Sequence, residues 1–359
     1  MNRNKACRSL YNNAGRITGE KYLSCLHLTV AFGLCCLLFA PGTAESAEIT
    51  PFQTFNQNPL VQIFGLPAAE SAILQPAGRT LALLGADIAN NFAHDSAQGE
   101  QILLDGESYR LTLGLRRGIT DKIEAGIDIP WVGHGAGVFD HFIEGWHDFF
   151  GLPQGGRKEA PRNRLLYTYS RNDREQLHLD DSSFGLGDIR LTGGLQLYHD
   201  RQPNPRAVAL RASIKLPTGS SSKLHGSGST DVALWLTASD DYLLPGPWGH
   251  LTLFGATGGM AMTNGDVLQD QQRNLVGFGD LGFGWSPVEW IAFKTQLSGT
   301  TPFYQGSTLK ELNDPLLLFT IGGTLAFSSS TALEIGVSED LAVSTAPDVA
   351  LHLGLSHRF

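Results

Sequence analysis

From residue 79 onward, apolar and polar residues alternate along much of the chain, the pattern of β-strands with one apolar and one polar face. Between 109 and 116, apolar residues occupy the odd positions, and small, polar or charged residues occupy the even ones. The same alternation returns at 123–131, after a turn at 118–121, which predicts an antiparallel hairpin. This part of the chain is therefore expected to be all-β.

Twelve segments carry the alternating pattern, although it is lost within 250–262 and blurred near 316–319. A further short strand fits residues 165–170. We therefore expect a transmembrane antiparallel β-barrel of about 12 strands, with 10–14 as the range that the pattern allows. The expected strands are 79–91, 108–117, 122–131, 188–198, 206–216, 230–240, 250–262, 275–286, 290–302, 316–328, 331–338 and 348–359.

The connections between these strands alternate in length. The even ones are short, at 118–121, 199–205, 241–249, 287–289 and 329–330. The odd ones are mostly long, at 92–107, 132–187, 217–229, 263–274, 303–315 and 339–347. Transmembrane barrels combine short periplasmic turns with long external loops, so this parity favours a membrane barrel over a soluble sandwich. An even strand number then places both termini in the periplasm.

Aromatic residues gather at the short-turn end of the expected strands, as in the interfacial girdle of a membrane barrel: Tyr198, Trp248, Trp285, Trp290, Phe327 and Phe359. Ordinary core aromatics are the alternative interpretation. The last strand ends in Phe359, which is similar to the C-terminal assembly signal of Gram-negative outer-membrane barrels. The partners implied by this placement are outer-membrane lipids, lipopolysaccharide and the barrel-assembly machinery.

The N-terminus has the features of a secretory signal peptide. Residues 1–47 combine five basic residues, an apolar stretch at 26–40 and a run of small residues at 42–47. A membrane anchor is the alternative, which the short apolar stretch disfavours. We expect a signal peptide at 1–47, a periplasmic or lumenal segment at 48–78, and an outer-membrane barrel at 79–359.

Composition narrows the functional classes. The chain has 359 residues and a formal charge of -9, with 17% charged residues. Outside the leader no apolar run is long enough for a spanning helix, and an acidic chain does not attract nucleic acid. All four cysteines lie in the leader, at positions 7, 25, 35 and 36. We therefore predict no disulfide, no cysteine-based zinc site and no cofactor.

The insertion at 132–187 contains one expected amphipathic helix, at 137–151. Its apolar stripe includes Phe142, Trp146 and Phe149, which would pack against the barrel rim or plug the lumen. Its polar face carries the weak catalytic or metal-binding candidates Asp140, Glu144 and His147. A single such set supplies too few ligands for a metal, so a structural plug is the favoured interpretation.

Charged residues occupy the face of the strands that points away from lipid: Arg110, Arg116, Glu124, Asp128, Arg190, Arg211, Lys215, Asp280, Lys294 and Glu334. Two interpretations stand side by side: a salt-bridge network that fills a modest lumen, or a charged constriction that sorts solutes. The segment at 51–76 is apolar enough to enter this lumen as a plug.

Several motifs resemble a family of Gram-negative outer-membrane proteins defined only as a domain of unknown function. They are DGESYR at 105–110, FDHFIEGWHDFFGLP at 139–153, GLGDIR at 185–190, KLPTG at 215–219 and SED at 338–340. The GLGD and LPTG pieces are also similar to outer-membrane proteins associated with the degradation of phenol and other aromatic compounds. The resemblance implies a location, and it implies no activity or site residues.

These observations favour a passive channel or transporter for small, hydrophobic or aromatic molecules. A lipid-modifying hydrolase of the outer membrane is the enzymatic alternative, and a purely structural or assembly barrel is the third. The chain has no nucleophile-elbow motif, and His352 and Ser356 lie too far apart on one strand to pair. The sequence names no solute.

Overall fold

A computed structural model describes residues 48–137, 163–200, 204–341 and 345–359. The predicted leader at 1–47 lies outside these residues, as does the predicted helix at 137–151 apart from its first residue. The candidate residues that fall on this helix also lie outside the described residues. They are the plug candidates Phe142, Trp146 and Phe149 and the catalytic or metal-binding candidates Asp140, Glu144 and His147.

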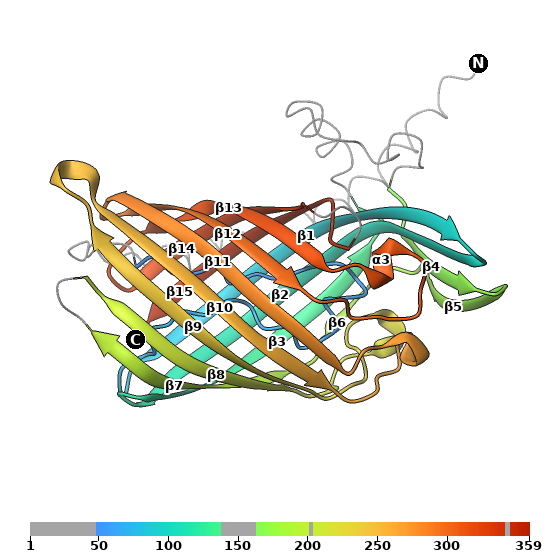
Figure 1. The fold of residues 1–359 in the computed structure, drawn as a ribbon, viewed down its shortest axis with the longest axis horizontal. Coiled ribbons are helices and arrows are strands. Elements are labelled where there is room, and N and C mark those ends of the chain that lie inside the picture. Colours follow the sequence, from blue (N-terminus) through green and yellow to red (C-terminus); the bar gives the residue numbers. More distant parts are fainter. Residues whose placement is uncertain (1–47, 138–162, 201–203, 342–344) are drawn as a thin grey trace, which may run out of the picture. The chain divides into compact units, whose positions relative to one another are not determined.

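Within the described residues, twelve strands form a closed antiparallel barrel (Figure 1). Each of the twelve strands pairs with the ring strand before it and the ring strand after it, and β15 returns to pair with β1 from Leu81–Arg358 to Asn90–Val349. The strands are β1 (Thr80–Ala97), β2 (Glu100–Thr120), β3 (Ile123–Gly135), β7 (Arg190–Asp200), β8 (Arg206–Lys215), β9 (Asp231–Leu243), β10 (His250–Met262), β11 (Leu275–Val288), β12 (Ile291–Thr300), β13 (Leu316–Ala326), β14 (Thr331–Asp340) and β15 (Val349–Arg358). Closure leaves no unpaired sheet edge within the ring.

The barrel confirms the predicted fold class, including β10 and β13, where the alternation was weakest. Three short strands lie outside the ring: β4 (Leu166–Arg171), β5 (Arg174–Leu179) and β6 (Ser183–Leu186). The additional strand expected at 165–170 corresponds to β4, which pairs with β2 and extends the sheet beyond the barrel. The described helical turns are also short: η2 (Ser221–Lys223), η3 (Gly246–Trp248), η4 (Gln269–Gln271) and α3 (Lys310–Asn313).

One expectation about the connections was wrong. The segment at 92–107 is not a loop, because β1 and β2 continue through it and turn only at Gln98 and Gly99. Exposed positions there are polar, which hides the lipid-facing alternation, while Ile102 and Leu104 point inward and are buried. The expected connection at 303–315 is present between β12 and β13, and it contains α3, which at four residues is too short to produce a helical period.

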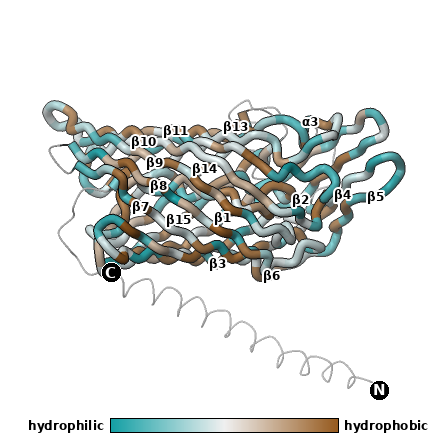
Figure 2. The backbone as a smooth tube through the Cα atoms, turned by 60° about the horizontal axis from the view of Figure 1, so that its bottom comes forward, coloured by the Kyte–Doolittle hydropathy of each residue, from teal (hydrophilic) through white to brown (hydrophobic). Residues whose placement is uncertain are grey.

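Apolar side chains cover the outside of the barrel wall. On β2, Leu111, Leu113 and Leu115 are exposed, whereas Arg116, which follows Leu115, points inward and is 3% exposed. Figure 2 shows this alternation as hydrophobic and paler positions along the strands, and shows the β4–β5 hairpin as largely hydrophilic. An exterior of this kind suits the hydrocarbon region of a bilayer. Among the described residues, no helix is both long and apolar enough to cross a membrane.

The expected aromatic residues lie at the short-turn end and face outward. Trp248 is 61% exposed and Phe359 is 63% exposed, and Trp285 packs beside Trp248 with ring centroids 6.5 Å apart. The Phe359 backbone also helps close the barrel, since its N–H donates to the Thr80 carbonyl at 2.9 Å. Exposed aromatics at one rim are typical of a membrane interface.

Candidate functional site: the barrel lumen

Residues 48–75, here named the lumen segment, precede β1 and form no helix or strand. They are nevertheless largely buried, with Phe52, Leu60 and Ile63 at most 2% exposed. In Figure 1 the segment, in blue, is visible between the strands of the wall. Buried backbone groups require hydrogen bonds, and here the side chains of the barrel wall supply many of them.

Cationic side chains of the wall donate hydrogen bonds to carbonyl oxygens of the lumen segment. The pairs are Lys294 with Thr50 at 3.0 Å, Arg110 with Gln62 at 3.3 Å, Lys215 with Ile63 at 3.2 Å, Arg190 with Leu66 at 3.1 Å and Arg211 with Ser71 at 2.6 Å. These cations come from four different strands around the ring, since Arg211 and Lys215 both lie on β8. The segment is thus held from several sides.

Acidic and amide side chains accept hydrogen bonds from the backbone N–H groups of the segment. The pairs are Phe52 with Gln296 at 2.9 Å, Gln53 with Glu334 at 2.9 Å, Gly65 with Asp231 at 2.6 Å, Leu74 with Gln196 at 3.0 Å and Gln75 with Glu124 at 2.8 Å. Charged and amide side chains on the lumen face therefore provide the backbone hydrogen bonds that a neighbouring strand would otherwise provide.

A buried ion cluster surrounds Glu70 of the lumen segment. Arg116 donates to both of its carboxylate oxygens, at 3.1 and 3.0 Å, and Arg211 donates to one of them at 2.8 Å. Arg116 also pairs with Asp128, and Arg211 pairs with Glu124. Because such charges are costly to bury singly, each carboxylate here contacts at least one guanidinium.

A second cluster surrounds His352. Its Nδ1 lies 2.7 Å from Asp87 and its Nε2 lies 3.0 Å from Glu334. Lys294 forms an ion pair with Glu334, and the Thr54 hydroxyl of the segment donates to Asp87 at 2.7 Å. A third cluster joins Lys215 to Asp188 at 2.7 Å and to Asp231 at 3.0 Å. The second and third clusters also hydrogen-bond the segment.

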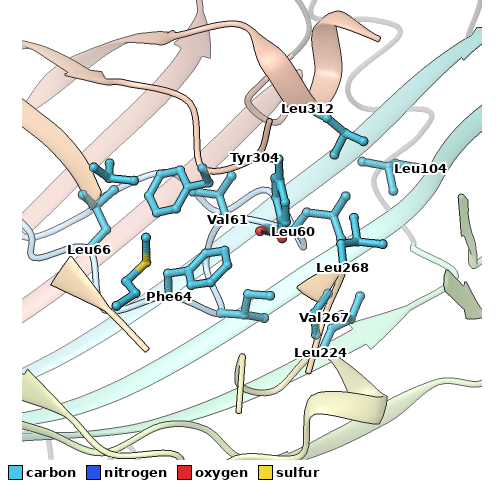
Figure 3. Packing of buried hydrophobic residues seen from close by; sticks show 14 of the residues in the cluster. Leu60, Val61, Phe64, Leu66, Leu104, Leu224, Val267, Leu268, Tyr304 and Leu312 are labelled. Atoms are coloured by element: carbon cyan, nitrogen blue, oxygen red, sulfur yellow. Dashed lines mark hydrogen bonds between the residues drawn. The ribbon is translucent and has the colours of Figure 1, made fainter. Parts of the chain in front are cut away.

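The end of the lumen near the long connections is apolar. Leu60 and Phe64 of the lumen segment pack there with residues of the long connections and of the β1–β2 hairpin (Figure 3). Phe64 stacks on Phe303 with centroids 5.1 Å apart, and the Tyr304 hydroxyl donates to the Leu60 carbonyl at 2.8 Å. Phe303, in a connection expected to be a long loop, is therefore a buried core residue.

Two cavities flank the lumen segment. One, of about 120 Å³, is lined by Glu70, Arg116 and Arg211 and extends to Ser329 at the short-turn end. The other, of about 60 Å³, is lined by Phe55 and Arg110 among other residues. Both are small because the segment occupies most of the lumen.

The structure places the predicted lumen residues on the inner face of the wall. Nine of the ten belong to the ion clusters or hydrogen-bond the segment directly: Arg110, Arg116, Glu124, Asp128, Arg190, Arg211, Lys215, Lys294 and Glu334. Asp280 instead accepts a hydrogen bond from the Gln296 side chain at 3.4 Å.

Sequence reasoning missed four acidic residues that complete these clusters. Asp87 and Asp231 lie at inward positions of β1 and β9, so the alternation could have identified them. Asp188 belongs to the GLGD motif, where it accepts hydrogen bonds from the backbone of Gly219 and Ser227. Glu70 lies in no strand, and its only signal is that it is an acidic residue within a segment that has no basic residue.

Two serine–histidine pairs lie near the long connections. The Ser183 hydroxyl lies 2.9 Å from His225 Nε2, and the Ser108 hydroxyl lies 3.3 Å from His134 Nδ1. Burial lowers the pKa of His225, and Lys223 adds to the effect. Within the described part of the chain, neither histidine contacts a carboxylate that would orient it as a catalytic base, and no group of three or more metal-ligating side chains occurs.

The fold is similar to that of the COG4313 outer membrane channel from Pseudomonas putida F1, at 13% identity and a TM-score of 0.51. That match covers 80% of this chain and 98% of the other. The NanC porin matches at 9% identity and a TM-score of 0.43, over 77% and 98% of the two chains. No curated protein matches. A family model described as a protein of unknown function, DUF3187, matches residues 28–359, so the chain belongs to the DUF3187 family.

Proposed function

We propose that the protein is an outer-membrane channel for small molecules and that the lumen segment closes it at rest. One observation carries this proposal. Among the described residues, no backbone-to-backbone hydrogen bond joins residues 48–75 to a strand of the barrel. The segment can therefore leave the lumen while every strand pairing of the wall stays intact.

The lining supports solutes that have both polar and apolar parts. Charged groups line the middle of the lumen, and the cluster around Phe64, Phe303 and Tyr304 lines the end near the long connections. The apolar cluster favours hydrophobic or aromatic molecules. The similarity in fold to a protein described as an outer membrane channel agrees with this proposal.

The proposed location is the outer membrane, in contact with lipid and lipopolysaccharide. The apolar exterior and the exposed aromatic rim at the short turns support it. Fractionation of cells on a density gradient tests the location. Recovery of the mature protein from the soluble periplasm without detergent would contradict it.

Planar bilayers and proteoliposomes test the channel function. The purified full chain should give discrete conductance steps and should admit small solutes such as benzyl alcohol. A variant lacking 137–151 should conduct more if the predicted helix also occludes the lumen. Absence of conductance and of solute entry in both proteins would refute the channel, and turnover of phospholipid or lipid A would favour the hydrolase.

A further inference from the structure

Glu70 is bound as a ligand would be. It is one of two acidic residues in the lumen segment, with Glu48, and the segment contains no basic residue. Arg116 contacts it through Nε and Nη2, one bond to each carboxylate oxygen, and Arg211 adds a third bond. A side-on guanidinium fits the planar geometry of a carboxylate and is less suited to a spherical ion such as chloride.

The two arginines are held in place without Glu70. Arg116 also donates to both oxygens of Asp128, at 2.8 and 3.1 Å, and Arg211 donates to Glu124 at 2.9 Å. Asp128 and Glu124 are wall residues on β3. Arg116 would therefore keep its orientation if the lumen segment moved away, and Arg211 would keep its bond to Glu124 while losing its two bonds to the Ser71 carbonyl.

One further negative charge balances the charged wall residues around Glu70. Three guanidinium groups, from Arg116, Arg190 and Arg211, face two wall carboxylates, those of Asp128 and Glu124. One positive charge is left over in a buried setting, and Glu70 neutralises it. A group that replaces Glu70 should therefore be a monoanion, because an unpaired buried charge is strongly unfavourable.

The cavity beside Glu70 gives a solute a route to Arg116 and Arg211. It is lined by Glu70, Arg116 and Arg211 at its inner part and by Ser329 and Arg358 at the short-turn end. Ile73 and other apolar side chains line the same space, so an apolar body can lie next to the carboxylate.

We infer that Arg116 and Arg211 form a binding site for the carboxylate of a solute, that Glu70 occupies this site at rest, and that a monocarboxylate displaces it. The inference rests on the proposed channel function and names its substrate class: small molecules with one carboxylate and an apolar body. Displacement of Glu70 also loosens the lumen segment, so the solute itself promotes opening.

Binding of benzoate and of its neutral analogue benzamide tests the inference on the full-length protein in detergent. Glu70→Gln removes the competing charge and keeps the shape, so benzoate should bind at least about tenfold more tightly than to the wild type, the effect of one charge-assisted hydrogen bond. Benzamide binding should not change. Glu175→Gln is the matched control, because Glu175 lies on β5 outside the ring, is exposed and pairs with His178. Equal benzoate affinity in the wild type and Glu70→Gln, or an equal gain for benzamide, would overturn the inference.

A second measurement needs no variant. Benzoate should raise the open probability of the wild-type channel in bilayers, and benzamide at the same concentration should not. Equal responses to the two compounds would overturn the inference while leaving the channel function intact. If neither the wild type nor a variant conducts, the channel function fails, and the comparison of benzoate binding between the wild type and Glu70→Gln still decides whether the carboxylate site exists.

Discussion

Replacing Arg116 by glutamine should release the lumen segment. Arg116 lies on β2, is 3% exposed, and makes two hydrogen bonds to Glu70 and two to Asp128. Its contact with Asp128 joins two residues of the wall, so it is present whether the segment is in or out. Of the bonds that Arg116 makes, only those to Glu70 distinguish the closed state from the open one.

The expected shift follows from those bonds. Removing one partner of a buried ion pair costs about 3–5 kcal/mol. The lower end applies here, because Arg211 still holds Glu70 at 2.8 Å. A loss of about 3 kcal/mol changes the ratio of open to closed channels by about a hundredfold.

Single-channel recording in planar bilayers measures this ratio. Arg117→Gln is the matched control, since Arg117 is the next residue and is exposed, and within the described part of the chain its side chain hydrogen-bonds only to the Thr80 hydroxyl. Heat-dependent mobility on gels should show that both variants are folded barrels. An open-to-closed ratio for Arg116→Gln equal to that of the wild type, or equal to that of Arg117→Gln, would refute the reasoning.

Two further predictions concern the rim and one loop. Phe359→Ser should lower the outer-membrane level of the protein several-fold. Phe184→Ser is the control and should not lower it, although Phe184 is as exposed as Phe359, at 64%. Equal levels of the two variants on immunoblots would contradict an assembly role for Phe359. Acidification below pH 6.5, the ordinary pKa of histidine, should destabilise the loop at 217–229, because burial lowers the pKa of His225 and so makes protonation of the folded loop unfavourable. Hydrogen exchange of the loop amides should rise in the wild type relative to His225→Gln at low pH, and the same ratio at pH 5 and pH 8 would contradict this.

The barrel was predictable because its signal is local. Alternation along each strand sets which side chains face lipid, and Leu111, Leu113 and Leu115 follow that rule. The same rule predicts that Arg116 and Lys294 point inward. It fails beyond the bilayer, where the outer face of the β1–β2 hairpin becomes polar and the period disappears.

The contacts of the lumen segment were not predictable to the same degree. The segment has no repeating pattern, since it forms no strand or helix. Its partners are distant in the sequence, such as Glu334 for Gln53 and Arg211 for Glu70. Its apolar composition predicts that the segment is buried. The partner of each of its polar atoms cannot be predicted in the same way, because it depends on which wall residues the closed ring of strands brings together.

A reversible disulfide between the lumen segment and the wall tests the central claim most directly. A Cβ atom at Gly65 would lie 3.1 Å from the Cβ of Asp231, so a small shift reaches the spacing of about 3.5–4.5 Å that a disulfide needs. The natural cysteines all lie in the predicted leader, and Gly65→Cys alone serves as the control. The double variant Gly65→Cys, Asp231→Cys should be shut when oxidised and should recover the conductance of the Gly65→Cys control after addition of a reductant. Equal conductance before and after reduction, with the disulfide verified by mass spectrometry, would contradict a lumen segment that moves to open the channel.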